Sequence, residues 1–298
     1  MIYTGELAAL ATSLLFSFTS IFFTLAGRRV GSMVVNRTRL AMSVVLLSVT
    51  HWVMLGSPLP LYAEPERWLW LGLSGIVGLA LGDIFLFQAF VSIGPRLSML
   101  MMSLAPLIAT IQAWIFLGET MNAGQIAGIL ITLVGITWVV MKHNGDNNQK
   151  NPDYARGILY GLGGAMGQAT GLVLAKNGLF GAFSPISANI IRMITAAVVL
   201  WMMTFIQREA GKTLKTLVED RRGMGFTIAG AITGPLLGVS FSLLAVQRTE
   251  VGVASTLMAL PPLFLLPLSY VVFKDRFGWG AVAGTFVAVF GVAILFLV

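Results

Sequence analysis

Long apolar runs recur along this chain, and each has the length that an α-helix needs to cross a lipid bilayer. At a rise of 1.5 Å per residue, about 20 residues cover a hydrocarbon core roughly 30 Å thick. We mark ten such runs and predict an all-α integral membrane protein with ten transmembrane helices. Their approximate bounds are residues 5–26, 35–55, 68–92, 96–117, 123–141, 156–176, 186–206, 224–246, 252–273 and 279–297.

The composition supports a membrane location and excludes other classes of protein. Of 298 residues, 57% are hydrophobic and 10% are charged, which is too little charge to cover a soluble protein of this length. With no cysteine and two histidines, a thiolate or histidine metal site is not expected, and we predict neither a metal nor a cofactor. The net charge of +7 comes from basic residues scattered in short loops, so we expect a lipid bilayer and no nucleic acid as partner.

The second half of the sequence repeats the first. A shift of 156 positions places Pro106 on Pro262 and continues without a gap over three predicted helices. A shift of 153 positions pairs the Asn-x-x-Arg motif at residues 36–39 with the same motif at residues 189–192. Apolar sequences that resemble each other by chance would not also repeat their polar residues. We therefore predict an internal repeat.

The repeat defines the predicted domain organisation. A polar linker at residues 144–155 separates two copies, which we place at residues 1–143 and 156–298. Each copy has an odd number of predicted spans, so the second copy enters the membrane from the opposite side. The predicted fold is two inverted five-helix repeats, an architecture that transporters use for alternating access to a site at the midplane.

Two matching stretches, residues 89–121 and 245–277, carry a family resemblance. Each has an alanine at the end of the third span and a proline within the fourth, and a glycine-rich fifth span follows. They resemble the EamA domain of the drug/metabolite transporter superfamily. The resemblance implies export or exchange of small metabolites such as amino acids, sugars, nucleotide derivatives or drug-like cations, often coupled to protons or to a counter-substrate. We expect a monomer or homodimer in the bacterial cytoplasmic (inner) membrane.

The charge distribution and the resemblance disagree about orientation. Fifteen of the 19 lysines and arginines fall on the side that the chain reaches after its first span. Basic residues favour the cytoplasmic side, so the count places both termini outside the cytoplasm. Related ten-helix carriers commonly keep both termini in the cytoplasm, and the orientation stays open.

Asp83 lies near the middle of the third predicted span and is the one carboxylate placed so deeply. A charge at the bilayer centre costs at least ~2.5 kcal/mol, so such residues usually have a function. Asp83 can load a proton or pair with a substrate amine. The alternative is an ion pair with an arginine that only holds helices together. Its repeat partner is Val239, so any acid chemistry is confined to one half.

The two Asn-x-x-Arg motifs supply four more candidates. Asn36 with Arg39, and Asn189 with Arg192, are spaced so that each amide and guanidinium share one helix face. Each guanidinium can hold a substrate carboxylate or phosphate through two hydrogen bonds, or form an ion pair that gates the path. The alternative is that the arginines extend to lipid phosphates.

Five further residues complete the candidate set. Gln88 and Gln168 are predicted to line a cavity, and Trp114 to line a pocket. The alternatives are amide hydrogen bonds in the core and packing against lipid. Pro106 and Pro262 are predicted to kink the helices in which they lie and to serve as hinges.

Glycines spaced four and seven residues apart form a stripe on the fifth span of each copy. Such stripes allow helices to approach closely, either between the two halves or in a dimer. The glycines are Gly124, Gly128 and Gly135 in the first copy and Gly280, Gly284 and Gly291 in the second.

These features favour a secondary active transporter that exports or exchanges a small polar metabolite, such as an amino acid, by alternating access. Proton coupling is one option for its energy source. A multidrug cation exporter and a non-transporting scaffold or receptor subunit are the alternatives. A membrane-embedded enzyme is not expected, because the spans offer Asp83 and His51 but no paired acids, Ser/His set or metal set.

Overall fold

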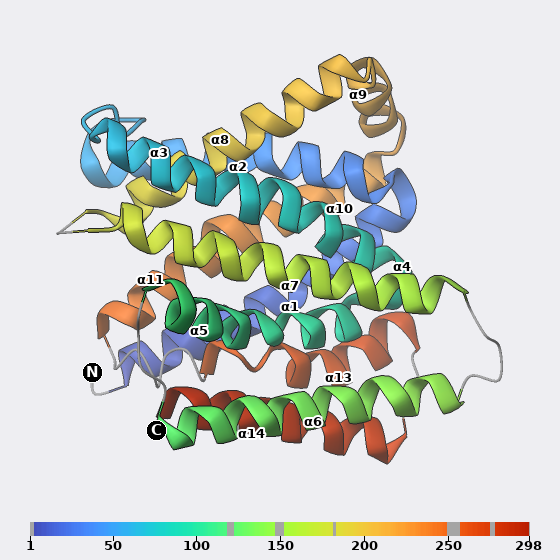
Figure 1. Cartoon of the computed structure of the whole chain (residues 1–298). Helices are drawn as coiled ribbons and strands as arrows, with labels where there is room; N and C mark the ends of the chain where they lie inside the picture. The colour runs from blue at the N-terminus through green and yellow to red at the C-terminus, as the bar shows by residue number, and fades with distance from the viewer. Residues whose placement is uncertain are drawn as a thin grey trace.

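The computed structural model describes residues 3–117, 122–146, 152–180, 183–248, 257–274 and 278–297, and these ranges are helical with no strand. Both termini lie at one end of a bundle, called here the terminal end; the other is the distal end (Figure 1). The first half contains α1 (Thr4–Val30), α2 (Ser32–Leu55), α3 (Pro65–Ser74), η1 (Gly75–Gly82), α4 (Asp83–Met102), α5 (Leu104–Leu117) and α6 (Ala123–Asp146). The second half contains α7 (Pro152–Gly178), α8 (Pro185–Ile206), α9 (Ala210–Glu219), α10 (Arg221–Ala231), η2 (Ile232–Gly238), α11 (Val239–Arg248), α13 (Pro261–Phe273) and α14 (Trp279–Leu297).

Seven helices among the described residues are long and apolar enough to cross a membrane, which makes this a multi-pass membrane protein. In this set α3, η1 and α4 form one continuous apolar segment, Pro65–Met102. The shorter apolar helices α13 and α14 correspond to the ninth and tenth predicted spans. The ninth was predicted to begin at residue 252, which lies outside the described ranges. The count of ten spans therefore stays a prediction.

The region predicted as the fourth span, residues 96–117, contains an interruption. Gly94 separates it from the third span with a φ of 78°, a conformation that glycine adopts without a steric penalty. The helix then continues to Met102, turns at Ser103 and resumes as α5. The fourth predicted span thus consists of two short helical pieces rather than one helix.

The two repeat-related prolines stand in the first turn of their helices. Pro106 is the third residue of α5 and Pro262 the second of α13, and the interruptions lie before them, at Ser103 and Leu260. Backbone N–H groups in the first turn of a helix have no acceptor within the helix, so a proline, which has no N–H, is tolerated there. Each predicted span is thus broken within the turn before its proline, as expected where a proline cannot continue the hydrogen bonds of a helix. Their role as hinges stays a prediction.

Each half contains a π-helical segment at the same place in the repeat. η1 and η2 end at glycines related by the 156-residue shift, Gly82 and Gly238, and an α-helix follows each directly. π-Helical turns are rare and are often found at functional sites. In the first half, a Cβ at Gly82 would lie 3.1 Å from the Cα of Gly167, so η1 approaches α7 backbone to backbone.

The two halves pack on each other reciprocally. η1 and α4 of the first half contact α7, whereas η2 and α11 of the second half contact α1. α2 packs on α8, and α6 packs on α14. In each of these pairs the partners occupy equivalent places in the repeat. α1 runs away from the terminal end and α7 runs toward it (Figure 1).

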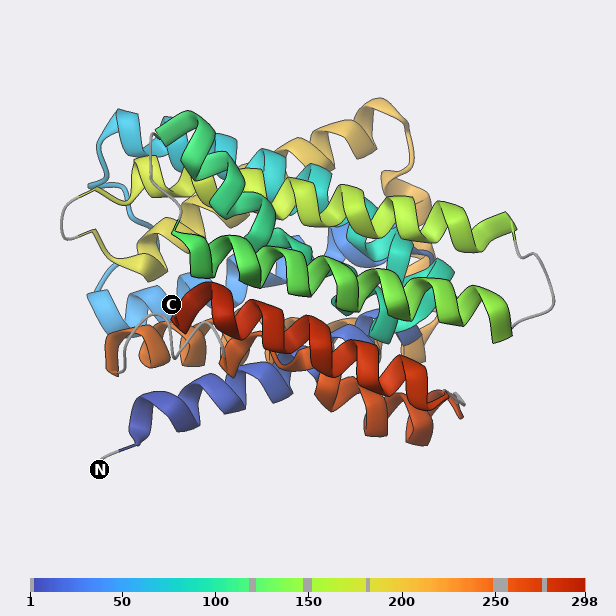
Figure 2. The same ribbon diagram turned by 60° about the horizontal axis from the view of Figure 1, so that its bottom comes forward.

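The glycine stripes of α6 and α14 face each other within the chain. A Cβ on Gly135 would lie 2.3 Å from the amide nitrogen of Ala288, and one on Gly128 would lie 2.6 Å from that of Leu295. Figure 2 shows the two helices side by side across one face of the bundle. The stripe therefore packs the last helices of the two halves together.

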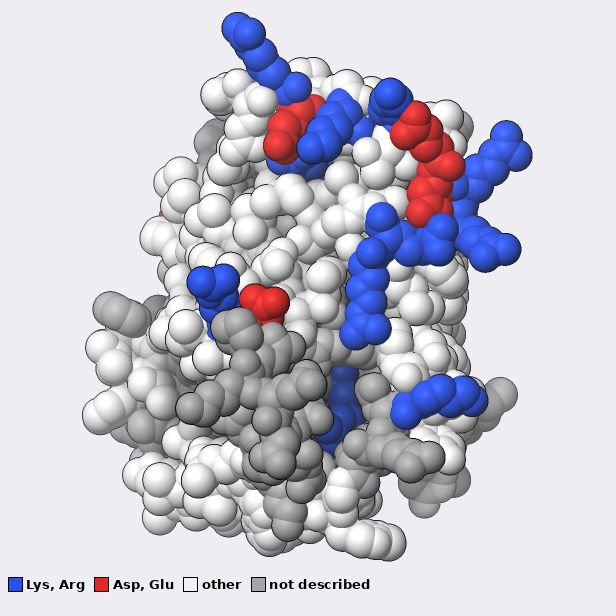
Figure 3. Space-filling model, turned by 90° about the vertical axis from the view of Figure 1, so that its right-hand side faces the viewer, with Lys and Arg blue, Asp and Glu red and all other residues white. Residues whose placement is uncertain are grey.

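Exposed basic side chains gather at the distal end, with a few acidic ones among them (Figure 3). The short helix α9 lies there, with Thr213 and Leu217 buried. The buried Arg37 donates a hydrogen bond to Thr213 and forms an ion pair with Glu209 at 2.8 Å. The exposed basic residues of this end are Arg28, Arg29, Arg156, Arg208, Lys212, Lys215, Arg221, Arg222 and Lys274.

Candidate functional site

A cavity of about 530 Å³ lies inside the bundle and is lined by residues of both halves. Its volume is within the range of small-molecule binding sites, about 300–1,000 Å³. Five of the candidates predicted from the sequence line it together, although they come from four different helices. They are Arg39 of α2, Asp83 of α4, Gln168 of α7, and Asn189 and Arg192 of α8.

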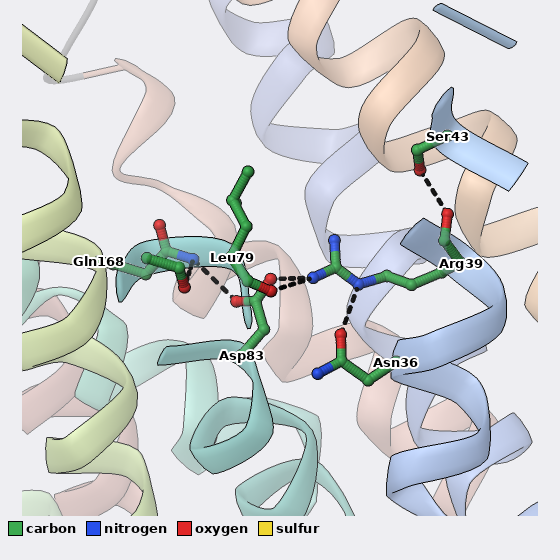
Figure 4. A network of polar contacts seen from close by, with 7 residues as sticks. Asn36, Arg39, Ser43, Leu79, Asp83 and Gln168 are labelled. Atoms are coloured by element: carbon green, nitrogen blue, oxygen red, sulfur yellow. Dashed lines mark hydrogen bonds and ion pairs between the residues drawn. The ribbon is translucent and has the colours of Figure 1, made fainter. Parts of the chain in front are cut away.

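Asp83 occupies the centre of this polar group. It is the first residue of α4, directly after η1, and is 3% exposed. One carboxylate oxygen forms a buried ion pair with the guanidinium of Arg39, and the other accepts a hydrogen bond from Gln168 Nε2 at 2.7 Å (Figure 4). Since Arg39 and Gln168 belong to different halves, the carboxylate links the halves across the cavity.

The guanidinium of Arg39 is held from several directions. Asn36 Oδ1 accepts a hydrogen bond from its Nε at 3.2 Å, and the carbonyl oxygen of Leu79, within η1, accepts one from Nη2 at 3.3 Å (Figure 4). Its Cζ lies 4.9 Å from the ring centroid of Phe87, a cation–π contact. Arg39 is 5% exposed, so it does not extend to lipid. Asn36 positions Arg39 but does not itself line the cavity.

Arg192 and Asn189 share the cavity but lack partners. Among the described residues, the guanidinium of Arg192 donates no hydrogen bond and forms no ion pair, and its buried Nε is unsatisfied. Asn189 as a whole is 9% exposed, and its buried Nδ2 also has no hydrogen-bond acceptor. Buried donors without acceptors are rare in folded proteins. This face of α8 therefore offers donors to a bound molecule.

The cavity extends toward the terminal end. Leu179 and Pro185, on either side of the connection between α7 and α8, belong to its lining. Farther toward the distal end its lining includes aromatic rings of α1 and α4. The centroids of Phe23 and Phe87 lie 4.9 Å apart and those of Phe87 and Phe90 5.7 Å apart.

Four remaining candidates lie elsewhere. Gln88 accepts a hydrogen bond from Ser32 at 2.7 Å and lines a separate cavity of about 190 Å³. Trp114 is 50% exposed on α5, as expected for a side chain that faces lipid. Pro106 and Pro262 are not part of the cavity lining. Among the described residues, no group of three or more histidines and acids could hold a metal ion.

The sequence interpretation missed the apolar wall of the cavity. Phe87 and Phe90 lie four and seven residues after Asp83, and this spacing places them on the same face of α4. That periodicity was the available signal. The wall also includes Phe16, Phe23, Met99 and Met102.

Comparison with known proteins identifies the family. The sequence model of the EamA-like transporter family matches the chain twice, over residues 3–141 and 155–297. The chain belongs to the EamA-like transporter family. The resemblance drawn from the motifs is thereby confirmed, and membership of this family indicates a membrane transporter.

Relatives of this EamA-like protein give little more about its activity. No curated protein matches its sequence. One solved structure, described only as a crystal structure of a protein, aligns with 99% of this chain and 96% of its own chain. The TM-score is 0.60 and the sequence identity 18%, so the similarity is one of fold alone.

Proposed function

We propose that this protein is a secondary active transporter that carries a small polar metabolite through the central cavity by alternating access. The observation that supports this most is the polar group around Asp83. Its members come from both halves and lie in a cavity within an otherwise apolar bundle. Charged groups at that depth are costly and are typical of substrate or ion sites.

We further propose that the fold is ten spans in two inverted repeats, at residues 1–143 and 156–298. Reciprocal packing supports this proposal, because η1 contacts α7 as η2 contacts α1. A two-fold axis in the membrane plane would relate such pairs and would reverse the direction of the second half. The opposite directions of α1 and α7 agree with this (Figure 1).

Alternating access requires a closed end that can open. The cavity reaches toward the terminal end, and the aromatic rings around Phe87 pack on one another in its distal part. Closer to the distal surface, Arg29 of α1 pairs with Asp220, just before α10, at 2.9 Å. Opening the distal end would separate these groups while the terminal end closes.

The gathering of basic residues at the distal end supports an orientation with that end in the cytoplasm (Figure 3). Both termini would then lie outside. This proposal is testable by labelling single cysteines, introduced in place of Tyr3 and of Arg222, with a membrane-impermeant maleimide in intact cells. Labelling of the cysteine at position 222 but not of the one at position 3 would show that the protein has the opposite orientation.

Asp83 is the candidate coupling residue. Because it accepts bonds from Arg39 and Gln168, loading a proton would require the ion pair to break. Protonation of Asp83 would then be linked to a movement of α2 relative to α4. If transport is proton-coupled, Asp83→Asn should abolish uphill transport while sparing exchange. Unchanged proton-driven uptake in this variant would remove Asp83 from that role.

Counterflow in proteoliposomes tests the function itself. Vesicles preloaded with members of a panel of amino acids, nucleotides, sugars and organic cations are exposed to the labelled compound outside. We expect accumulation for one chemical class, reduced by Arg192→Ala and unchanged by Asp153→Asn, which alters an exposed acid. No accumulation of any class by folded protein would favour the scaffold alternative.

A further inference from the structure

The charges that line the cavity do not balance. The described lining contains two guanidinium groups, from Arg39 and Arg192, and one carboxylate, from Asp83. Asp83 forms its ion pair with Arg39 and attracts Arg192 only over a longer distance, so among the described lining residues Arg192 has no carboxylate of its own. An unpaired charge away from bulk water is unfavourable. A bound group with one negative charge would remove the imbalance.

The unsatisfied hydrogen-bonding groups at this place are donors. They are Arg192 Nε and Asn189 Nδ2, three residues apart and therefore on one face of α8. A carboxylate has two oxygens that only accept hydrogen bonds, and it pairs with guanidinium through short charge-assisted bonds. An ammonium group offers only donors and could satisfy neither.

The other side of the cavity is apolar. Arg192 lies beside η1, since its Nη2 is 3.6 Å from the position that a Cβ on Gly78 would take. Phe87 and Phe90 follow Asp83 on α4, farther toward the distal end. Phe23, Met99 and Met102 extend that wall. A molecule bound here would have its charged end near Arg192 and its apolar part among these side chains.

We propose that the cavity binds a monoanionic organic molecule, with its carboxylate on Arg192 and Asn189 and its apolar body among the phenylalanines. This proposal names the substrate class of the proposed transporter. Only the claim that the bound molecule is transported rests on the proposed function. A cation is disfavoured because both oxygens of Asp83 already accept bonds. A neutral amide would leave the charge of Arg192 uncompensated.

Two series of compounds, each with one apolar body and an anionic, neutral or cationic head group, test the proposal. One is phenylacetate, phenylacetamide and 2-phenylethylamine; the other is hexanoate, hexanamide and hexylamine. Each is titrated into detergent-solubilised protein at pH 7.5, and the shift of the thermal unfolding midpoint gives an apparent Kd. We expect the anion of each series to bind at least about 10-fold more tightly than the amide and the amine.

Variants assign the effect to the cavity. Arg192→Gln should weaken anion binding by about 10- to 100-fold and remove the preference for the anion. Asn189→Leu, which keeps the branched shape of the side chain but removes its amide group, should weaken anion binding by a smaller factor of about 5. Arg222→Gln, at an exposed position, should change nothing. If Arg192→Gln does not fold, Asn189→Leu still tests the site.

The possible results distinguish a failure of the anion-binding proposal from a failure of the transport proposal. A preference for amine or amide, equal binding within a series, no binding by any member, or anion binding unaffected by both α8 variants would overturn it. The same variants are then measured in proteoliposomes with labelled phenylacetate. Anion binding without flux would leave the binding site in place and contradict the transport function alone.

Discussion

Replacement of Gly135 by alanine should destabilise the protein by forcing α6 and α14 apart. The added Cβ would lie 2.3 Å from the amide nitrogen of Ala288, 2.7 Å from its Cα and 2.8 Å from the carbonyl oxygen of Gly284. Ordinary van der Waals contact begins at 3.4 Å, so the closest approach is short by 3.4 − 2.3 = 1.1 Å. All three atoms are backbone, so no side chain can turn away. The helices themselves have to shift.

The size of the effect follows from two opposing contributions. Overpacking of a close interface costs about 1–3 kcal/mol. Alanine is favoured over glycine within a helix by about 0.5–1 kcal/mol, which offsets part of this cost. Because the clash is with backbone, we expect a net loss of about 1–2 kcal/mol in the free energy of unfolding. Gly225→Ala in α10 is the matched control, since nothing lies within 4 Å of its Cβ. It should be neutral or stabilising.

Reversible unfolding in one detergent, with wild type and both variants side by side, measures the difference. The identical chemical change should lower stability at Gly135 and not at Gly225. Equal stability of the two variants would refute the close contact between α6 and α14. If the stripe served a dimer instead, Gly135→Ala would change the molar mass seen by light scattering without lowering the stability of the monomer.

Three further predictions concern ion pairs. Asp83→Asn should cost more stability than the double variant with Arg39→Gln, with a coupling energy above about 1 kcal/mol in a double-mutant cycle, because the single change leaves a buried guanidinium unpaired. Glu209→Gln should cost about 1–3 kcal/mol, since it removes the carboxylate from buried Arg37, and equal stability of wild type and variant would refute this. The amide of Gly223, and to a smaller extent Arg29, hold the pKa of Asp220 below its ordinary value. Its contribution to stability is therefore complete above the ordinary aspartate range of about 4 and is lost as pH falls through the lower folded-state value; Asp220→Asn should flatten this part of the stability–pH curve.

Much of the fold was predictable because membrane crossing imposes a simple rule on composition. A run of about 20 apolar residues needs no knowledge of its neighbours to be recognised. The interruption at Ser103 and the π-helical segments could not be found in this way. They depend on which backbone approaches which, as where Gly82 meets Gly167, and hydropathy does not record such contacts.

Site residues of an unusual type could be predicted from the sequence, whereas those selected by their position around a helix or by helix packing could not. Asp83 stood out because a carboxylate in an apolar span is unusual. Gln88 was selected for its nearness in sequence, but five residues at 100° each place it about 140° around the helix from Asp83. Phe87 at four residues stays within about 40° of Asp83 and faces the cavity with it. The pairing of Asp83 with Gln168 required the packing of α7 on α4, which no local pattern encodes.

The repeat and the proposed substrate charge are connected through one missing carboxylate. The same Asn-x-x-Arg motif stands in both halves, so the scaffold supplies two guanidinium groups, Arg39 and Arg192. In the first half Asp83 follows η1 and neutralises Arg39. In the second half the residue after η2 is Val239, which lines the cavity but carries no charge that could neutralise Arg192. A bound carboxylate would supply for Arg192 the negative charge that Asp83 supplies for Arg39. A repeated scaffold can thus hold an asymmetric ligand, because the second half lacks the acid that completes the first.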